Sequence, residues 1–162
     1  MKTLATLKKL FTSVVNKVYR YFLMKRMASA VAVVRPFLYR GQLAVLISMC
    51  LDEESTFFIR QLIELARKIK RMPVTYEQDG LGKQAIVHLH YFRGGSDWYI
   101  TEKDALGGVA QAFGYVILNG DFHCAEFGYI SIEEIVQYGA ELDLCFRPCT
   151  LAQILAEKAI FE

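Results

Sequence analysis

The sequence predicts an α+β fold, in which basic N-terminal helices pack with a mainly antiparallel sheet of four to five strands and two short C-terminal helices. Apolar residues recur at three- and four-residue spacing through the first 71 residues, which is the period of an α-helix. From residue 85 onward, short β-branched and aromatic runs alternate with turns rich in Gly, Asn and Asp, as in a β-meander.

Residues 1–72 are expected to form a basic helical region of three helices. The first covers residues 4–22, where apolar side chains recur on one side and most cations lie on the other, so it is a basic amphipathic helix. The second is expected to carry Pro36 in its first turn. The third is capped by Asp52 or Ser55 and ends in a cluster of cations.

Residues 73–162 are expected to form an α+β domain around the meander and to pack with the helices as one compact unit. The predicted strands cover residues 85–92, 98–102, 111–118, 127–130 and 142–146. Ser131 with Glu134, and Thr150 with Gln153, have the spacing of capping boxes. A short helix is therefore predicted after each of these two caps.

Charge divides the chain into two halves. Residues 1–80 hold 14 basic and 6 acidic side chains, a net charge of +8, whereas residues 81–162 hold 5 and 11, a net charge of −6. No acidic residue precedes Asp52. This asymmetry predicts an anionic partner for the basic half. The alternative interpretation is that the basic half is a solvated surface that keeps the protein soluble. The candidate contact residues are Lys8, Lys9, Lys17, Arg20, Lys25 and Arg26.

The N-terminal helix does not have the pattern of a secretory signal. Lys8, Lys9 and Lys17 interrupt its apolar residues, and no clear cleavage site follows. The later apolar runs, residues 28–34 and 43–51, are shorter than the ~20 residues that a bilayer span needs. We therefore expect a cytoplasmic protein without a transmembrane segment.

Four segments carry a resemblance to a known family: HYFRGGSDWYITE, FGYVILNGD, AEFGYISIEEI and GAELDLCFRPCTLAQI. In this order, between Met72 and Ile154, they resemble the family catalogued as domain of unknown function 2958. The resemblance implies a setting on plasmids, phages or other mobile elements and supplies no established activity. Phe127 stands where the family pattern has Trp, which keeps an aromatic ring but loses the indole N–H donor.

Histidines and cysteines of the second half invite comparison with a zinc site. They are His88, His90, His123, Cys124, Cys145 and Cys149. Their spacing lacks the paired, closely spaced ligands of structural zinc sites, so no metal is predicted. The glycine pairs lack the Lys and Ser/Thr of a phosphate loop, and no cofactor is predicted. The cysteines are expected to be free thiols.

Carboxylates near strand ends support two interpretations. Asp97, Glu102, Asp121 and Glu126 are candidates for an acidic binding face. Alternatively, carboxylates at these strand ends hold a metal ion in a hydrolase or nuclease. No nucleophile or base accompanies them at a recognisable spacing, so no catalytic residue is assigned.

Taken with the resemblance, these observations predict a non-catalytic macromolecule-binding protein of a mobile element or phage, acting in DNA maintenance or against host defence. The expected partner is a host or mobile-element protein, with nucleic acid as a further partner of the basic half. The basic and acidic halves of two copies are also complementary, which makes a homodimer possible. The metal-dependent hydrolase or nuclease is the alternative.

Overall fold

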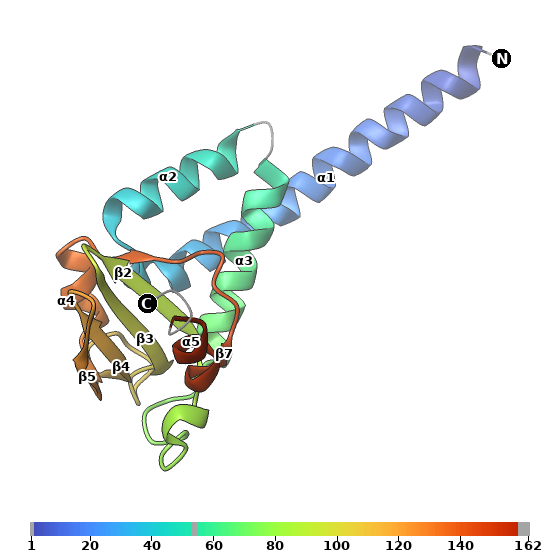
Figure 1. Cartoon of the computed structure of the whole chain (residues 1–162). Helices are drawn as coiled ribbons and strands as arrows, with labels where there is room; N and C mark the ends of the chain where they lie inside the picture. The colour runs from blue at the N-terminus through green and yellow to red at the C-terminus, as the bar shows by residue number, and fades with distance from the viewer. Residues whose placement is uncertain (1, 53–54, 159–162) are drawn as a thin grey trace.

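A computed structural model describes residues 2–52 and 55–158, with side chains from residue 11 onward except residues 13 and 16 (Figure 1). The elements are α1 (Lys2–Val34), the 3-10 helix η1 (Arg35–Phe37), α2 (Arg40–Leu51), α3 (Ser55–Arg71), η2 (Gly82–Gln84), β1 (Ile86–Val87), β2 (Leu89–Arg93), β3 (Ser96–Glu102), β4 (Ala112–Leu118), β5 (Asp121–Ile130), α4 (Ile132–Gln137), β6 (Glu141–Leu142), β7 (Cys149–Thr150) and α5 (Leu151–Lys158). The predicted α+β fold is confirmed.

The first helix is longer than predicted, because α1 continues through the apolar run at residues 28–34. The expectation that Pro36 lies in the first turn of the second helix is wrong. Pro36 belongs to η1, after which Leu38 is extended, with φ −122° and ψ 138°. Pro36 lacks an N–H and the extended Leu38 interrupts the helical path, so α2 begins only at Arg40.

The third predicted helix is confirmed as α3, with cations in its last turn. The backbone N–H of Ser55 donates to the backbone carbonyl of Asp52 at 3.0 Å, where the helix starts. At the other end, the ammonium of Lys103 donates to the carbonyls of Ile69 and Lys70, at 3.0 and 2.9 Å. This lysine follows β3, so it satisfies terminal carbonyls of α3 and ties the helix to the sheet.

The main sheet is antiparallel, with strand order β5-β4-β3-β2-β6. Asn119 and Gly120 form a two-residue hairpin turn between β4 and β5, and both have positive φ, 52° and 72°. The predicted strand at residues 142–146 is largely wrong, because β6 ends at Leu142. The Asp143 carboxylate accepts the backbone N–H of Cys145 at 2.8 Å, and this local turn replaces the ladder.

The two faces of the sheet bury separate cores. Leu89, Tyr91 and Ile100 face the helices α1, α2 and α3, whereas Tyr99 and Ile117 face α5. Both predicted C-terminal helix starts are confirmed. The backbone N–H of Glu134 donates to the Ser131 hydroxyl at 3.1 Å, and the Thr150 hydroxyl accepts from the backbone N–H of Gln153 at 3.2 Å.

Candidate binding surface on the helical half

The helix α1 divides into an inner segment, residues 23–34, and an outer segment, residues 11–22. The inner segment buries Leu23, Met27, Ala30 and Val34 against the core of the helical layer. These four residues recur at three- and four-residue spacing, so they occupy a narrow arc of about 60° around the helix axis. Figure 1 shows the other end of α1 extending away from the rest of the chain.

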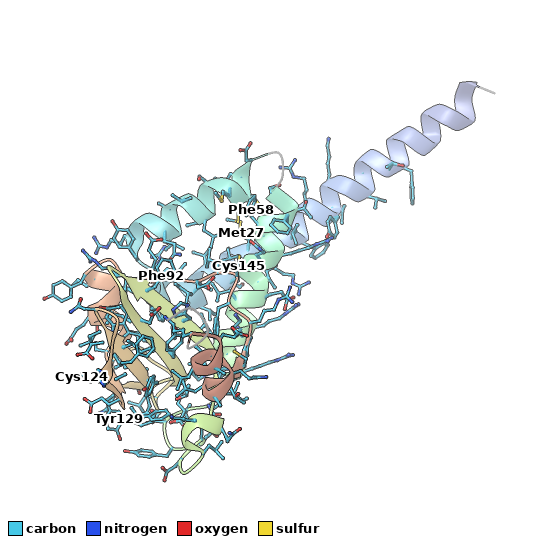
Figure 2. All side chains as sticks on the ribbon, in the orientation of Figure 1. Met27, Phe58, Phe92, Cys124, Tyr129 and Cys145 are labelled. Atoms are coloured by element: carbon cyan, nitrogen blue, oxygen red, sulfur yellow. The ribbon has the colours of Figure 1, made fainter. Side chains whose placement is uncertain are left out.

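The outer segment exposes large apolar side chains. We call six of them, which are between 46% and 73% exposed, the apolar face of α1: Phe11, Val14, Val15, Val18, Tyr21 and Phe22. At 100° per residue they fall within an arc of about 120°, whose centre lies about 150° from the buried arc of the inner segment. The apolar side of the helix therefore changes between the two segments, and Figure 2 shows side chains standing free along this part of the helix.

A groove lined by cations lies between α1 and α3, and we call it the basic groove. Lys25 and Arg26 of α1 and Arg67 and Lys70 of α3 line this space of about 290 Å³. Arg67 also forms an ion pair with Glu64. The four cations come from two helices, so α1 and α3 together concentrate positive charge in one place.

A second groove, of about 280 Å³, continues the basic groove toward the outer segment. It shares Arg26 and Arg67 with the basic groove and adds Tyr19, Phe22 and Arg60. One guanidinium nitrogen of Arg60 donates to the Tyr19 hydroxyl at 3.2 Å, and this hydrogen bond raises the pKa of Arg60. Phe22 belongs to both the apolar face and this groove, so the two features adjoin.

The six predicted basic contact residues all belong to α1. Lys8 and Lys9 lie outside the described side chains. Lys17 and Arg20 are exposed on the outer segment, and Lys25 and Arg26 line the basic groove. The ammonium of Lys25 also lies 5.2 Å from the centre of the Tyr21 ring.

The predicted acidic residues do not meet in one site. Glu102 is only 2% exposed, and its carboxylate accepts the backbone N–H groups of Tyr76 and Gln78. It therefore holds a loop and does not belong to an exposed face. Asp121 is exposed and accepts the backbone N–H of His123 at 2.9 Å, just after the β4–β5 turn.

Strand register separates the remaining two carboxylates. Glu126 pairs with Val116, which pairs with Trp98 on the helix-facing side of the sheet. Asp97 is the neighbour of Trp98 in β3, and alternation directs its side chain to the opposite face. Asp97 and Glu126 therefore do not converge on one site, as the hydrolase or nuclease alternative would require, although Glu126 itself is exposed.

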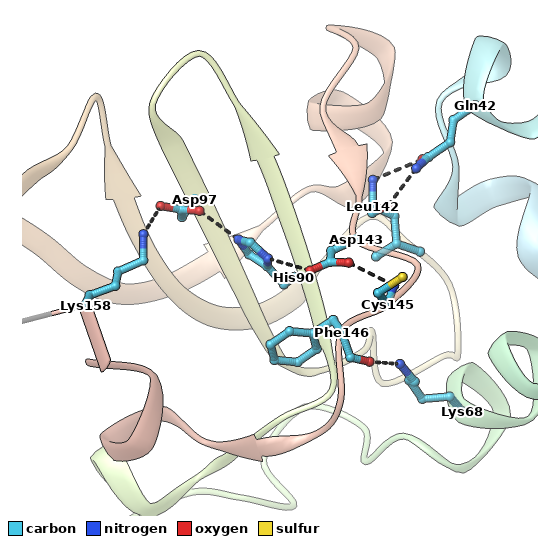
Figure 3. Close-up of polar contacts among 9 residues, drawn as sticks. All are labelled: Gln42, Lys68, His90, Asp97, Leu142, Asp143, Cys145, Phe146 and Lys158. Atoms are coloured by element: carbon cyan, nitrogen blue, oxygen red, sulfur yellow. Dashed lines mark hydrogen bonds and ion pairs between the residues drawn. The ribbon is translucent and has the colours of Figure 1, made fainter. Parts of the chain in front are cut away.

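The α5-facing side of the sheet instead holds a polar cluster around His90 (Figure 3). His90 Nε2 lies 2.7 Å from one Asp97 oxygen, and its Nδ1 lies 3.6 Å from Asp143. Lys158 of α5 donates to the other Asp97 oxygen at 2.6 Å. The His90 ring also stacks on Tyr99, with 4.7 Å between ring centres.

Charge pairing within this cluster changes the pKa values of its members. Burial opposes ionisation of Asp97, but hydrogen bonds from His90 and Lys158 outweigh it and lower the pKa of Asp97. Burial, aided by the charge of Asp97, raises the pKa of Tyr99 to about 12. Each ring nitrogen of His90 faces a carboxylate, so neither is directed at a substrate. The cluster fastens α5 and the segment after β6 to the sheet.

The structure offers no support for the zinc site considered above. Within residues 2–52 and 55–158, no three His, Cys, Asp or Glu side chains are placed to hold a metal ion. Asp97 and Asp143 approach opposite nitrogens of His90, so the three cannot share one ion. Burial and the charge of Lys68 lower the pKa of His88. All four cysteines are free thiols.

Another groove, of about 890 Å³, lies between the start of α2 and α4. Arg35 and Arg40 line it together with Glu133, so both signs of charge are present.

Gln42, in α2, closes the nearby edge of the sheet. Its side-chain amide donates to the Leu142 carbonyl at 2.6 Å and accepts the Leu142 N–H at 3.0 Å, which occupies the free side of β6 (Figure 3).

Comparisons with protein families, curated proteins and solved structures find no match for this chain. The resemblance to domain of unknown function 2958 therefore stays a prediction. None of the described helices combines the length and the apolar content that crossing a bilayer requires.

The basic groove was not predicted from the sequence, because its cations come from two separate helices, α1 and α3. Lys25 and Arg26 of α1 line the same groove as Arg67 and Lys70 of α3 only because the two helices pack together. A partial signal was available, since Lys25, Arg26 and Ser29 follow Phe22 by three, four and seven residues and so lie on one side of the helix.

Proposed function

We propose that this protein is a non-catalytic binding protein that holds an anionic partner, either a macromolecule or a lipid surface, on its helical half. The basic groove carries the proposal. The residues lining it and the adjoining groove include five cations and one carboxylate, that of Glu64. Cations this close repel one another, and an anionic partner placed between them would relieve the repulsion.

The hydrolase or nuclease alternative has less support. It requires strand-end carboxylates that converge, whereas Glu102 is buried against a loop and Asp97 and Glu126 point to opposite sheet faces. The exposed Asp121 and Glu126 are retained as a proposed second contact surface, suited to a basic partner.

The resemblance to domain of unknown function 2958 supports the biological setting within the proposal. In that setting the protein acts in the cytoplasm for a plasmid, phage or other mobile element. By binding its partner, the protein would contribute to DNA maintenance or to the blunting of host defence.

The test is binding of the full chain to polyanions at low and at physiological salt. Duplex DNA, RNA, polyglutamate and phosphatidylserine vesicles are the probes. We expect salt-sensitive binding to at least one of them, lost in the double variant Lys25→Glu/Arg26→Glu. The matched control reverses two exposed cations of the other half, Lys83→Glu/Arg147→Glu, and should bind as the unmodified chain does.

The result that overturns the proposal is equally concrete. If the unmodified chain binds none of the four probes at low salt, the helical half has no anionic partner. Equal losses in both double variants would also contradict it, because binding would then follow net charge and not the basic groove.

A further inference from the structure

We infer that the partner of the helical half is an anionic phospholipid surface, on which the outer segment of α1 lies with its apolar face among the headgroups. This inference rests on the proposed function and names its partner. It follows from three features of α1: the apolar face, the charges around it, and the alignment of both with the basic groove.

The first feature is the width and composition of the apolar face. Its six residues span an arc of about 120° and include Phe11, Tyr21 and Phe22. Helices that lie in a membrane interface bury such a face of aromatic and aliphatic side chains at the boundary between headgroups and acyl chains. Aromatic rings with a polar group, such as Tyr21, suit that boundary because one end is apolar and the other is hydrated.

The second feature is charge. Nine cations and no carboxylate occur before Asp52. On the outer segment, Lys17 and Arg20 are exposed and lie on the helix side away from the centre of the apolar face. Lys17 is the nearer of the two to the edge of the apolar face, and its long stem can reach the lipid phosphates while its charge stays hydrated. A helix with this distribution lies on an anionic bilayer and does not cross it.

The same charges disfavour a second copy of α1 as the occupant. Two such helices packed side by side would bring cations together with no acidic residue of α1 to compensate. A two-helix coiled coil also needs only a narrow seam, whereas Val15 and Phe22 widen the apolar face beyond it. A lipid surface covers the whole arc and supplies the missing negative charge.

The third feature is alignment along the helix. Lys25, Arg26 and Ser29 follow Phe22 by three, four and seven residues, so they continue the side of α1 that carries the apolar face. Lys25 and Arg26 line the basic groove. When the apolar face enters the headgroup region, this groove is brought to the level of the lipid phosphates, where Arg67 and Lys70 add their charges.

Flotation of the full chain with vesicles tests the inference. Phosphatidylcholine vesicles with and without phosphatidylserine are compared, using the variants Phe11→Ser/Val18→Ser/Phe22→Ser and Lys25→Glu/Arg26→Glu. We expect binding only to the anionic vesicles, and a loss of at least about tenfold in each variant. Each cation near an anionic surface contributes about fivefold, so reversing two should cost more than about 25-fold.

A matched control distinguishes insertion of the apolar face of α1 from nonspecific adsorption of exposed apolar side chains. Leu106 is 97% exposed in a loop of the other half, and Leu106→Ser/Leu118→Ser also removes exposed apolar side chains. It should bind the anionic vesicles as the unmodified chain does. Far-ultraviolet circular dichroism and thermal unfolding check that each variant stays folded, which is expected because all the substituted side chains are exposed.

The outcomes distinguish this inference from the proposed function. Salt-sensitive binding to DNA, RNA or polyglutamate without binding to anionic vesicles overturns the lipid inference and leaves the proposed function standing. Vesicle binding that survives the triple variant overturns the placement of the apolar face. A dimer that the triple variant dissociates, without vesicle binding, would show that a second copy covers the face. Binding to no probe overturns both.

Discussion

The two segments of α1 differ in what covers their apolar side chains. In the inner segment, Leu23, Met27, Ala30 and Val34 are buried against the other helices. In the outer segment, the six residues of the apolar face lie open on a part of the helix that extends away from the body (Figure 1). Helical periodicity places apolar residues along one side of each segment. Packing within this chain buries the apolar side of the inner segment and leaves that of the outer segment exposed. The lipid surface inferred above would cover the second.

The α5-facing side of the sheet is a second apolar face, and it is covered within the folded chain. Its α5-facing side would expose Tyr99 and Ile117, but Leu151 and Ile154 of α5 cover them. The ion pair between Lys158 and Asp97 fastens that helix. The α5-facing side of the sheet is thus covered by a helix that an ion pair holds in place, whereas the apolar face of α1 is exposed. The difference between these two faces can be tested at each of them.

The largest expected change in the free energy of unfolding comes from the inner segment of α1, and the outer segment provides the comparison. Met27→Ala should lower the free energy of unfolding by about 2–5 kcal/mol, because it leaves a cavity among packed helices. Val18→Ala should change it by less than about 0.5 kcal/mol, because Val18 is exposed. Urea unfolding measures both. Equal losses would mean that the outer segment is covered within the isolated protein.

A smaller effect is expected from loosening the cover of the sheet. Asp97→Asn keeps the shape of the side chain but removes the charge that Lys158 and His90 contact. We expect a loss of about 1.5–3 kcal/mol, the range for a hydrogen bond to a charged group. Thermal unfolding measures the loss, and Asp121→Asn, at an exposed turn, is the control. A variant as stable as the unmodified chain would show that this cluster does not hold α5.

The start of α5 provides a still smaller test. Thr150→Ala removes the hydroxyl that accepts the backbone N–H of Gln153 and should cost about 1 kcal/mol. Fraying of α5 would uncover the Tyr99 side of the sheet and increase the binding of an apolar dye. Ser131→Ala should cost a similar amount without exposing that side, because α4 does not cover it. Unchanged unfolding in both variants would contradict the assigned helix starts.

The pH dependence of stability tests the charge of Asp97 in the same cluster. The pKa of Asp97 is lowered in the folded state, so its contribution is fully present above the ordinary Asp value of about 3.9. It is lost as the pH falls through the lowered folded value. The difference in unfolding free energy between the unmodified chain and Asp97→Asn should therefore shrink as the pH is lowered below about 4. If the difference instead grows as the pH falls, the pKa of Asp97 is not lowered in the folded state.

Local sequence signals predicted much of the fold. The capping spacings of Ser131 and Thr150 and the Asn119-Gly120 turn act within a few residues, and the structure has all three features. The strand predicted at residues 142–146 failed because the Asp143 side chain makes a competing turn that alternation does not reveal.

The candidate site was less predictable, because it depends on contacts between distant residues. The cations of α1 were recognised, but their meeting with Arg67 and Lys70 depends on how α3 packs. The acidic face was expected to include Glu102, whose burial arises from the loop that folds over it. Composition records that charges are present and does not specify where tertiary packing puts them.

Hydrogen exchange of the full chain on phosphatidylserine-containing vesicles tests the central claim most directly. We predict slower amide exchange across residues 11–22 on these vesicles than in solution, and no slowing with phosphatidylcholine alone. The core strands β3 and β4 should exchange alike in every condition. If the vesicle-bound protein exchanges residues 11–22 as fast as the free protein, or gains protection mainly in β5, the outer segment of α1 is not the surface that meets the membrane.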